Sequence, residues 1–326
     1  MALDTILDTL EVTSDYTFSK THESLVASAI GKGKQIQKLK QLIDVSSPKR
    51  QKQYWKTYHC DRVKLQQGQK IVGSLCRKRW CNHCNRIKTK ELIHAYKDPL
   101  KDLGDLYFVT LTAPTVKARQ LKSELNKRYK AFTNIKDNIR KNYKTKIHGI
   151  RKTEVTYNEQ KDHYHPHFHL IVKGFHEAQL IQSLWLNQFS KASIKAQDIK
   201  PIDMANDKSL VEVFKYATKD VTKDKTSAKA MDNIYRALEG IRTIQTYGSI
   251  RKVKEPKEEK EVQNLITWKQ PTNDIWVYDE KEKDYLNAYN DRLLYTNDVV
   301  SEIINKSQKT SSKYLNKYIE SVKLNR

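Results

Sequence analysis

The sequence lacks the features of a membrane or secreted protein. No run approaches the roughly 18 consecutive apolar residues that a membrane-spanning helix requires. The N-terminal stretch MALDTILDTLEV is acidic, whereas the start of a secretory signal peptide is basic. These absences predict a protein that resides in the cytoplasm and has no membrane partner.

Acidic residues are scarce relative to basic ones. The 326 residues include 61 lysines and arginines against 38 aspartates and glutamates, which leaves a formal net charge of +23. A protein of this charge attracts polyanions, and binding releases the counterions condensed on them. Nucleic acid is therefore the predicted partner, although a ribosomal surface would satisfy the same charge.

Cysteine is absent from all of the chain except one short segment. The stretch HCDRVKLQQGQKIVGSLCRKRWCNHCNR contains every cysteine, the last two spaced as C-x2-C. Clustered thiolates close a tetrahedral Zn²⁺ site, and a reducing cytoplasm disfavours disulfides. We therefore predict one structural zinc ion bound by Cys60, Cys76, Cys81 and Cys84. His59 and His83 are alternative ligands in place of one cysteine, and unrelated free thiols are the other interpretation.

Basic residues surround these cysteines. Arg77 and Arg79 lie just before the C-x2-C pair, next to Trp80. Arginines of this kind are suited to phosphate contacts, and an aromatic ring among them is suited to stacking on a base. Arg77 and Arg79 are predicted to bind DNA, with a solvated charged face as the alternative.

The pattern along the chain predicts four regions and an α+β fold. The regions are a polar N-terminal extension (1–45), the cysteine-rich zinc-binding segment (46–100), a globular domain (101–255) and a charged, partly helical C-terminal region (256–326). In the globular domain, β-branched and aromatic residues predict strands over 106–114 and 149–158, with a helix between them. Further helices are predicted over 24–43, 178–191, 207–221 and 283–295.

Histidine recurs at every second position in the stretch KDHYHPHFHLIVKG. The four residues are His163, His165, His167 and His169. In an extended chain they all face one side, while Tyr164, Phe168, Leu170 and Val172 face the other. A row of neutral ring nitrogens backed by a hydrophobic core is a metal-binding geometry. Because Pro166 cannot donate to a strand ladder, the regular strand is predicted to start there, which makes His167 and His169 the fixed ligands.

A third ligand is predicted on the preceding strand. The four residues EQKD join the two strands, which is short enough for an antiparallel hairpin. Glu154 is the only carboxylate in IRKTEVT, and a register that sets it opposite His167 or His169 places it on the histidine face. An exposed strand glutamate is the alternative. Imidazole ligands favour Mn²⁺ over Mg²⁺, but the abundance of Mg²⁺ leaves both as candidate ions.

The predicted helix over 207–221 places a tyrosine beside a carboxylate. Its apolar stripe consists of Leu210, Val213, Phe214, Ala217 and Val221. Tyr216 lies off this stripe and shares the polar face with Glu212, four residues earlier and within side-chain reach. This pair is either a reactive phenol with an acid or base beside it, or a solvated tyrosine.

The order FVTLT, HPHFH and EVFKY resembles the three motifs of the HUH endonucleases. More narrowly, it is similar to the replication initiators of rolling-circle plasmids, whose third motif pairs one tyrosine with a glutamate. The cysteine-rich segment and YGSIRKV are similar to that group as well, over roughly residues 60–250. The resemblance implies an RRM-like antiparallel sheet with flanking helices that carries the HUH strand, preceded by a small zinc-binding segment.

The resemblance also implies a metal-dependent nicking and joining enzyme. Tyr216 would form a 5′-phosphotyrosyl link and leave a free 3′-OH that primes synthesis, and Glu212 would activate water for the closing cleavage. Lys215 would contact a phosphate or remain solvated. The implied partners are single-stranded or hairpin origin DNA and the host helicase and replication machinery.

Two other interpretations account for the same motifs. A conjugative relaxase or a single-strand transposase uses HUH chemistry too, although EVFKY and the cysteine segment favour the initiator. A non-catalytic, zinc-containing DNA-binding regulator with structural histidines is the alternative from another class of protein.

Overall fold

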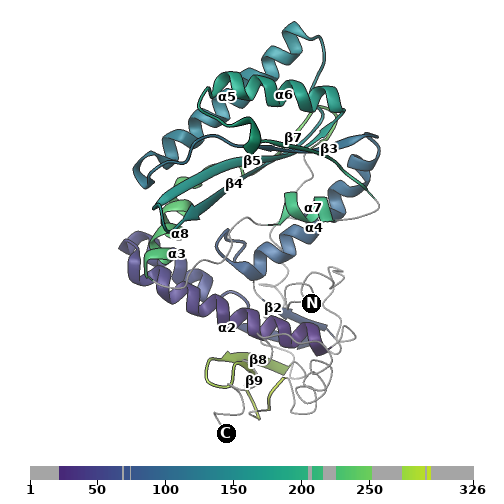
Figure 1. Cartoon of the computed structure of the whole chain (residues 1–326). Helices are drawn as coiled ribbons and strands as arrows, with labels where there is room; N and C mark the ends of the chain where they lie inside the picture. Colours follow the sequence, from purple (N-terminus) through teal and green to yellow (C-terminus); the bar gives the residue numbers. More distant parts are fainter. Residues whose placement is uncertain are drawn as a thin grey trace, which may run out of the picture. The chain divides into compact units, whose positions relative to one another are not determined.

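The structure is a computed structural model that describes residues 22–67, 70–73, 75–204, 208–215, 225–251, 274–290 and 292–294. The chain divides into two compact units (Figure 1): Met1–Cys84 with Pro256–Arg326 forms one, and Asn85–Glu255 forms the other. We refer to the first as the cysteine unit and to the second as the histidine unit.

The histidine unit is built on a five-stranded sheet in which neighbouring strands are antiparallel. The order is β6-β3-β5-β4-β7, so the histidine strand β5 lies at the centre. The strands are β3 Leu106–Leu111, β4 Gly149–Asn158, β5 His163–Lys173, β6 Asp198–Pro201 and β7 Ile244–Tyr247. The helices are α4 Asn82–Lys101, whose first turn belongs to the cysteine unit, η1 Ala118–Gln120, α5 Leu121–Asn142, α6 Phe175–Gln188, η2 Ile194–Ala196, α7 Lys208–Phe214 and α8 Lys225–Ala237.

The predicted hairpin of β4 and β5 is confirmed. The two strands pair continuously, from Gly149 opposite Val172 to Asn158 opposite His163. Asp162 ends the connecting loop in the left-handed region, with φ of 46°, which aspartate tolerates better than most residues. The hydroxyl of Tyr157 donates to the carboxylate of Asp162 at 3.0 Å. The short loop and the long ladder together fix which side chains share a face.

Different helices cover the two faces of this sheet, as Figure 1 shows. Phe168, Leu170 and Val172 of β5 are buried on the face covered by α5 and α6, as the alternation predicted. Ile171 is buried on the other face, together with residues of α4 and α7. Because the histidines occupy the same row as Ile171, they lie on the α4 and α7 side of the sheet.

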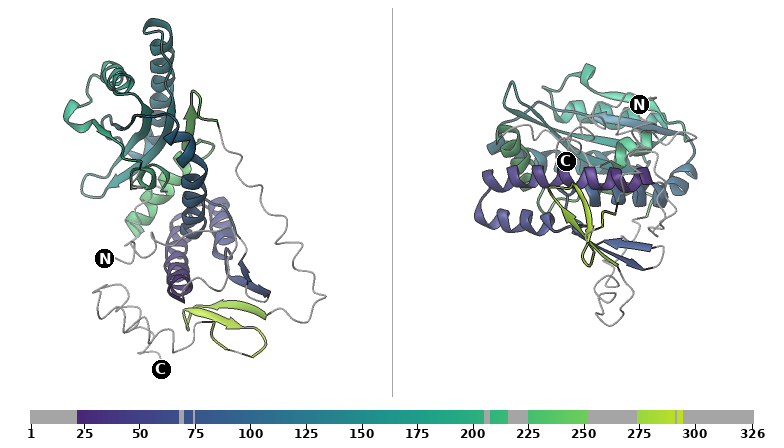
Figure 2. Two further views of the ribbon diagram at one scale, coloured as in Figure 1. Left: turned by 90° about the vertical axis from the view of Figure 1, so that its right-hand side faces the viewer. Right: turned by 90° about the horizontal axis from the view of Figure 1, so that it is seen from below.

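The cysteine unit combines segments from both ends of the chain. Its sheet has the order β2-β1-β8-β9, and β1 pairs antiparallel with β8 so that Val63 lies opposite Val277. Its elements are α2 His22–Val45, α3 Pro48–Tyr58, β1 Val63–Gln67, β2 Lys70–Gly73, β8 Asp274–Asp279 and β9 Asp284–Asn287. Figure 2 shows α2 and α3 side by side, with the β8–β9 hairpin next to α2. Part of the predicted C-terminal region therefore completes the sheet that follows α3.

The helix predicted over 283–295 is wrong, because this segment forms strand β9. Tyr285 is completely buried, and its hydroxyl donates to the backbone carbonyl of Asp61 at 2.8 Å. Pairing with β8, which itself pairs with the distant β1, outweighs the local helical spacing. The helices predicted over 24–43 and 178–191 are confirmed as α2 and α6.

The helix predicted over 207–221 is present as α7 up to Phe214. Leu210, Val213 and Phe214 of its apolar stripe are buried, as predicted. Residues 216–224 lie outside the described residues, so the predictions for Tyr216, Ala217 and Val221 are not addressed by the structure. No helix among the described ranges is both long enough and apolar enough to cross a membrane.

Candidate functional site

The β4–β5 hairpin brings three candidate metal ligands together. Glu154 lies opposite His167, so both side chains share one face with His169, two residues further along β5. The Oε2 atom of Glu154 is 3.3 Å from His169 Nε2 and 3.9 Å from His167 Nε2. The two Nε2 atoms are 3.1 Å apart. With all three ligand atoms within 4.8 Å of one another, this group can hold one metal ion.

The other ring nitrogens of the two histidines have protein partners. Nδ1 of His167 lies 3.0 Å from the backbone carbonyl oxygen of His165, which can only accept, so Nδ1 must carry the proton. Nδ1 of His169 lies 3.3 Å from the hydroxyl of Thr110 on β3. Metal-binding histidines characteristically use their second nitrogen in this way. With its Nδ1 protonated, His167 keeps an unprotonated Nε2 on the side of Glu154.

Burial sets the protonation states of this group. Burial lowers the pKa of His167 to about 4. Burial by itself would raise the pKa of Glu154. The hydrogen bond from the adjacent His169 ring and the charge of the Lys152 ammonium have the larger effect and lower this pKa to about 2. A neutral imidazole and an ionised carboxylate at pH 7 are the states in which these side chains bind metal ions. The unprotonated Nε2 of His167 next to the buried carboxylate of Glu154, with His169 Nε2 beside them, is a donor set that fits a cation.

The prediction that the regular strand starts at Pro166 is wrong, because β5 begins at His163. Tyr164 and Val116 exchange backbone hydrogen bonds of 2.8 Å on the side of β5 away from β4. Residues two apart on a strand direct their backbone groups to the same side, so Pro166 also faces away from β4. Pairing with β3 begins only at Phe168, so the missing N–H of Pro166 interrupts no ladder. Instead, the buried guanidinium of Arg128 donates to the carbonyl of Pro166.

His163 and His165 are outside the ligand group, as the sequence predicted for the loop end of the strand. The ring of His165 stacks on His167 with centroids 5.0 Å apart and planes 19° apart. Nδ1 of His163 contacts the backbone carbonyl of Lys161 in the loop. His165 therefore packs against the ring of His167, and His163 contacts the backbone of the hairpin loop.

Two residues near this site were missed by the sequence reasoning. Thr110 belongs to the FVTLT strand, and its register opposite His169 explains the hydroxyl contact. Lys152 lies opposite His169 on β4 and is 2% exposed. Its Nζ lies 3.2 Å from Glu154 Oε2 and donates to the backbone carbonyl of Glu212 at 2.9 Å. The alternation of β4, which puts Lys152 in the same row as Glu154, is the signal that could have identified it.

Helix α7 carries Glu212 near this sheet face, and Lys215 directly follows the helix. Lys215 Nζ and Glu212 Oε2 form an ion pair of 2.5 Å between two half-exposed side chains. Lys215 is therefore exposed and ion-paired with Glu212. Its predicted contact with a phosphate stays a prediction. Phe214 anchors the helix by stacking on Tyr96 of α4, with ring centroids 5.6 Å apart.

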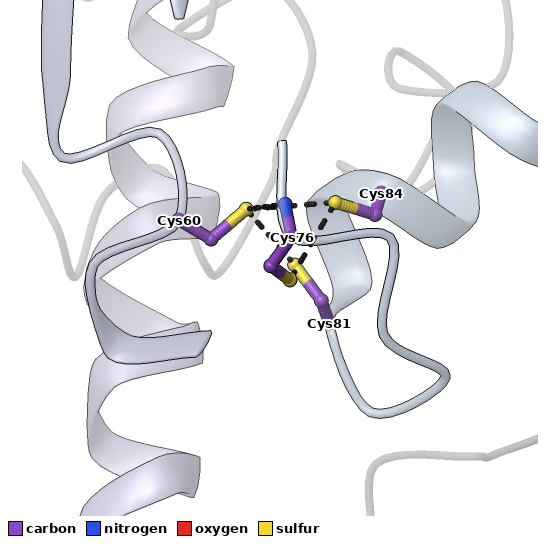
Figure 3. A group of neighbouring side chains, drawn as sticks. All are labelled: Cys60, Cys76, Cys81 and Cys84. Atoms are coloured by element: carbon purple, nitrogen blue, oxygen red, sulfur yellow. Dashed lines mark hydrogen bonds between the residues drawn. The ribbon is translucent and has the colours of Figure 1, made fainter. Parts of the chain in front are cut away.

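The four cysteines converge on one point in the cysteine unit, as Figure 3 shows. Cys60 follows α3, Cys84 lies in the first turn of α4, and Cys76 and Cys81 come from the segment between them. The Sγ–Sγ distances are 3.5 Å for Cys60–Cys84, 3.6 Å for Cys60–Cys81 and 3.8 Å for Cys76–Cys84. Four sulfurs at the usual Zn–S distance of about 2.3 Å around one ion would be about 3.8 Å apart. All four cysteines are free of disulfides, so the cluster can hold a metal ion.

Backbone groups support this cluster. The N–H of Cys76 points to Cys60 Sγ and the N–H of Arg77 to Cys84 Sγ, both at 3.3 Å. Arg77 adopts the left-handed region with φ of 49°, which turns the chain around the sulfurs. Hydrogen bonds from the neighbouring thiols, that of Cys60 first, lower the pKa of Cys76. Neither histidine alternative joins the cluster: His83 Nε2 faces the Asp61 carboxylate at 3.7 Å, and His59 caps α3 and is exposed.

Helix α2, predicted to lie in a polar extension, contacts the cluster region directly. Lys32 is buried, and its Nζ donates to the backbone carbonyls of Tyr58, at 2.8 Å, and of Cys60. The Gln35 side chain donates to Trp80 O at 3.2 Å and accepts from Asn82 N at 2.7 Å. These contacts tie α2 to both ends of the cysteine segment.

Trp80 belongs to the core, so the prediction that it stacks on a base is wrong. It is 7% exposed, its Nε1 donates to the hydroxyl of Thr57 at 2.7 Å, and its ring meets Tyr54 edge-on at 5.2 Å. Arg77 and Arg79 are half-buried next to the cluster. Their predicted contact with DNA stays a prediction.

The structure defines the class of the protein: it is an α+β protein with antiparallel sheets, a four-cysteine cluster and a Glu-His-His group. The chain belongs to the replication protein family Rep_1, whose family model matches residues 68–293. The matched range contains the Glu-His-His group and three of the four cysteines.

Curated relatives of the chain are all named "Protein rep". The relative from Staphylococcus aureus is 28% identical over 162 residues, which cover 44% of this chain and 69% of the relative. The relative from Streptococcus pneumoniae serotype 2 is 22% identical over 214 residues, covering 58% of this chain and 65% of the relative. The relative from Lactiplantibacillus plantarum is 27% identical over 218 residues, covering 58% of this chain and 68% of the relative. The chain thus matches about two thirds of the length of these relatives, and no solved structure matches it.

Proposed function

We propose that this protein initiates rolling-circle replication of a plasmid by nicking and rejoining single-stranded origin DNA through a phosphotyrosine intermediate. The observation that carries the proposal is the Glu-His-His group on the central hairpin, held within 4.8 Å and facing the α7 side of the sheet. Tyr216 is only two residues beyond the end of α7 in the sequence. Membership of a replication protein family supports this function over a relaxase or a transposase.

The topology supports an RRM-like core for the enzyme. The elements β3, α5, β4, β5, α6 and β6 follow one another as β-α-β-β-α-β, with the sheet order β6-β3-β5-β4. This succession places the HUH strand β5 between β3 and β4, with both neighbours contributing to the site through Thr110 and Glu154. The metal site is thus supported on three strands of a rigid sheet.

The chemistry assigns a separate task to each group. A divalent ion such as Mn²⁺ or Mg²⁺, held by His167, His169 and Glu154, would supply Lewis-acid neutralisation of the scissile phosphate. The phenol oxygen of Tyr216 attacks phosphorus and loses its proton, the P–O3′ bond breaks, and the leaving oxygen takes up a proton to become a free 3′-OH. The 5′-phosphate remains esterified to Tyr216, so the energy of the broken bond is retained for rejoining.

The remaining groups serve release and binding. Glu212 activates water for the closing cleavage, which hydrolyses a phosphodiester without a second tyrosine. Arg77, Arg79 and Lys215 contact DNA phosphates, and the net charge of +23 supports strong electrostatic attraction. Zn²⁺ in the four-cysteine cluster is structural. Origin DNA, single-stranded or in a hairpin, is the substrate, and the host helicase and replication machinery are the partners.

Covalent capture tests this function directly. The protein is incubated with a labelled single-stranded oligonucleotide that spans the origin nick site, with Mn²⁺, and the mixture is denatured and separated on a gel. A labelled band at the mass of the protein plus DNA is expected from the wild type and not from Tyr216→Phe, which keeps the ring but removes the nucleophile. Adduct formation by Tyr216→Phe would refute the tyrosine assignment, and a wild type that binds but never cleaves would favour the non-catalytic regulator.

A further inference from the structure

Lys152 is a buried cation within the Glu-His-His site that none of the proposed chemical steps uses. It lies in the same row of β4 as Glu154, opposite His169, and its side chain is 3% exposed. A lysine is rarely buried to this extent without a partner that makes its position necessary. Its ammonium has three donor hydrogens, and two acceptors around it come from different parts of the site.

The two acceptors are a ligand carboxylate and a helix end. Lys152 Nζ is 3.2 Å from Glu154 Oε2, the same oxygen that faces both histidine rings. It also donates, at 2.9 Å, to the backbone carbonyl of Glu212 in the last turn of α7. A last-turn carbonyl has no partner within its own helix, and a cation there interacts favourably with the helix dipole.

A second donor binds the last carbonyl of the same helix, two residues further on. The hydroxyl of Thr89 on α4 donates to Phe214 O at 3.1 Å. Phe214 itself is completely buried and stacked on Tyr96, so α4 sets where the last turn packs against the sheet. Lys152 connects this turn directly to the ligand carboxylate.

We infer that Lys152 is a positioning residue that sets the distance and orientation between the metal ligand Glu154 and the carboxyl end of α7, which precedes Tyr216 by two residues in the sequence. The expected effect on adduct formation rests on the proposed function, whereas the contacts of Lys152 do not depend on it. Through Glu154, Lys152 keeps one carboxylate oxygen directed at the histidines, which is the role of a hydrogen-bonding partner behind a metal ligand. Through Glu212, it holds the carboxyl end of α7 at a defined place beside the metal site.

The test compares Lys152→Met with Lys200→Met. Methionine has nearly the length of lysine and suits a buried site, but it offers no donor. Lys200 is the matched control, because it lies on β6 of the same sheet, with its side chain 69% exposed and paired with Asp198 at 2.7 Å. Three quantities are measured: Mn²⁺ affinity by calorimetry, hydrogen exchange of the 211–215 amides by mass spectrometry, and the rate of adduct formation at saturating Mn²⁺.

For Lys152→Met we expect Mn²⁺ affinity to fall by about 10- to 100-fold, as when a partner behind a metal ligand is lost. The 211–215 amides should exchange faster, and the adduct rate should stay low when Mn²⁺ is saturating, because added metal does not restore the helix contact. Lys200→Met should match the wild type in all three. Lys152→Gln, whose shorter amide cannot reach both acceptors, is the second variant if methionine prevents folding, and the same changes are expected.

Wild-type Mn²⁺ affinity and wild-type exchange in a folded Lys152 variant would overturn the inference. A lower melting temperature with unchanged affinity and exchange would overturn it equally, because it would show a role in packing alone. Failure of the proposed function is distinguishable: the wild type would then form no adduct, while the affinity and exchange measurements would still decide the role of Lys152.

Discussion

The Nε2 atoms of His167 and His169 lie 3.1 Å apart, while the Nδ1 atom of each ring contacts a protein oxygen. This relationship means that both rings are oriented before any ion binds. A pre-oriented ligand pair loses little conformational freedom on binding, so the two residues should act as a unit in metal affinity.

Substitution of either ligand histidine by alanine should abolish nicking. With one imidazole gone, two ligands remain and the ion is no longer held, so His167→Ala and His169→Ala should lose cleavage of single-stranded origin DNA. Salt-sensitive DNA binding should remain close to the wild type, because it derives mainly from the basic surface. His163→Ala is the control and should be milder, since His163 contacts the loop. Equal loss from all three would contradict the assignment of the ligands; cleavage and filter-binding assays provide the two readouts.

The two metal sites should respond differently to chelation. An ion bound by all four cysteines would be enclosed on all sides, so protein purified without chelator should contain close to one zinc per chain by elemental analysis. Brief dilute chelator should stop nicking, and Mn²⁺ should restore it without a change in zinc content. Cys81→Ser should lose zinc and lower the thermal stability of the cysteine unit, because site formation and folding are coupled. Wild-type protein without zinc would contradict the structural site.

Substitutions of Glu212 and Tyr216 should affect different steps: the closing cleavage for Glu212 and the first cleavage for Tyr216. Glu212→Gln keeps the shape of the side chain and removes the basic carboxylate, so the first nick and the adduct should form while termination fails. A plasmid replication assay should then give over-length single-stranded products, whereas Tyr216→Phe should give none. If Glu212→Gln fails to nick supercoiled origin plasmid, Glu212 deprotonates Tyr216 itself and the separation of roles is wrong.

Trp80 should matter for stability and not for DNA contact. Trp80→Phe removes the hydrogen bond to Thr57 and leaves a small cavity, so the free energy of unfolding should fall by about 1–3 kcal/mol in urea denaturation. Trp55→Phe is the control, because Trp55 is 45% exposed, and its change should stay within about 0.5 kcal/mol. The affinity of folded Trp80→Phe for origin DNA should equal that of the wild type. A stable variant with weakened binding would support the stacking role that the sequence suggested.

Period-two alternation made the site largely predictable from the sequence. In a hairpin with a short loop, the spacing of His167, His169 and Glu154 is sufficient to place them on one face, and the structure has them there. The four cysteines were predictable for a similar reason, since clustering in a short segment limits how far apart they can fold. Both predictions depend on local geometry.

Contacts between distant segments were decided by the tertiary structure alone. Strand β9 pairs where helical spacing suggested a helix, and Trp80 is buried by α3, because burial against distant partners outweighs local preference. The strand continues through Pro166 because the backbone of this residue faces the side of β5 where pairing with β3 has not yet begun. The guanidinium of Arg128 donates to its carbonyl oxygen instead.

The sequence by itself determined the chemistry of this protein: its ligand types, their spacing and its excess of positive charge. Only the tertiary structure decided which groups support the ligands. Thr110, Lys152 and the last turn of α7 meet at one site through strand pairing and helix packing. The contact of Lys152 with α7 joins residues 60 positions apart and that of Thr110 with His169 residues 59 apart. No local pattern encodes these two contacts, because the free energy of each depends on a partner that only folding brings near.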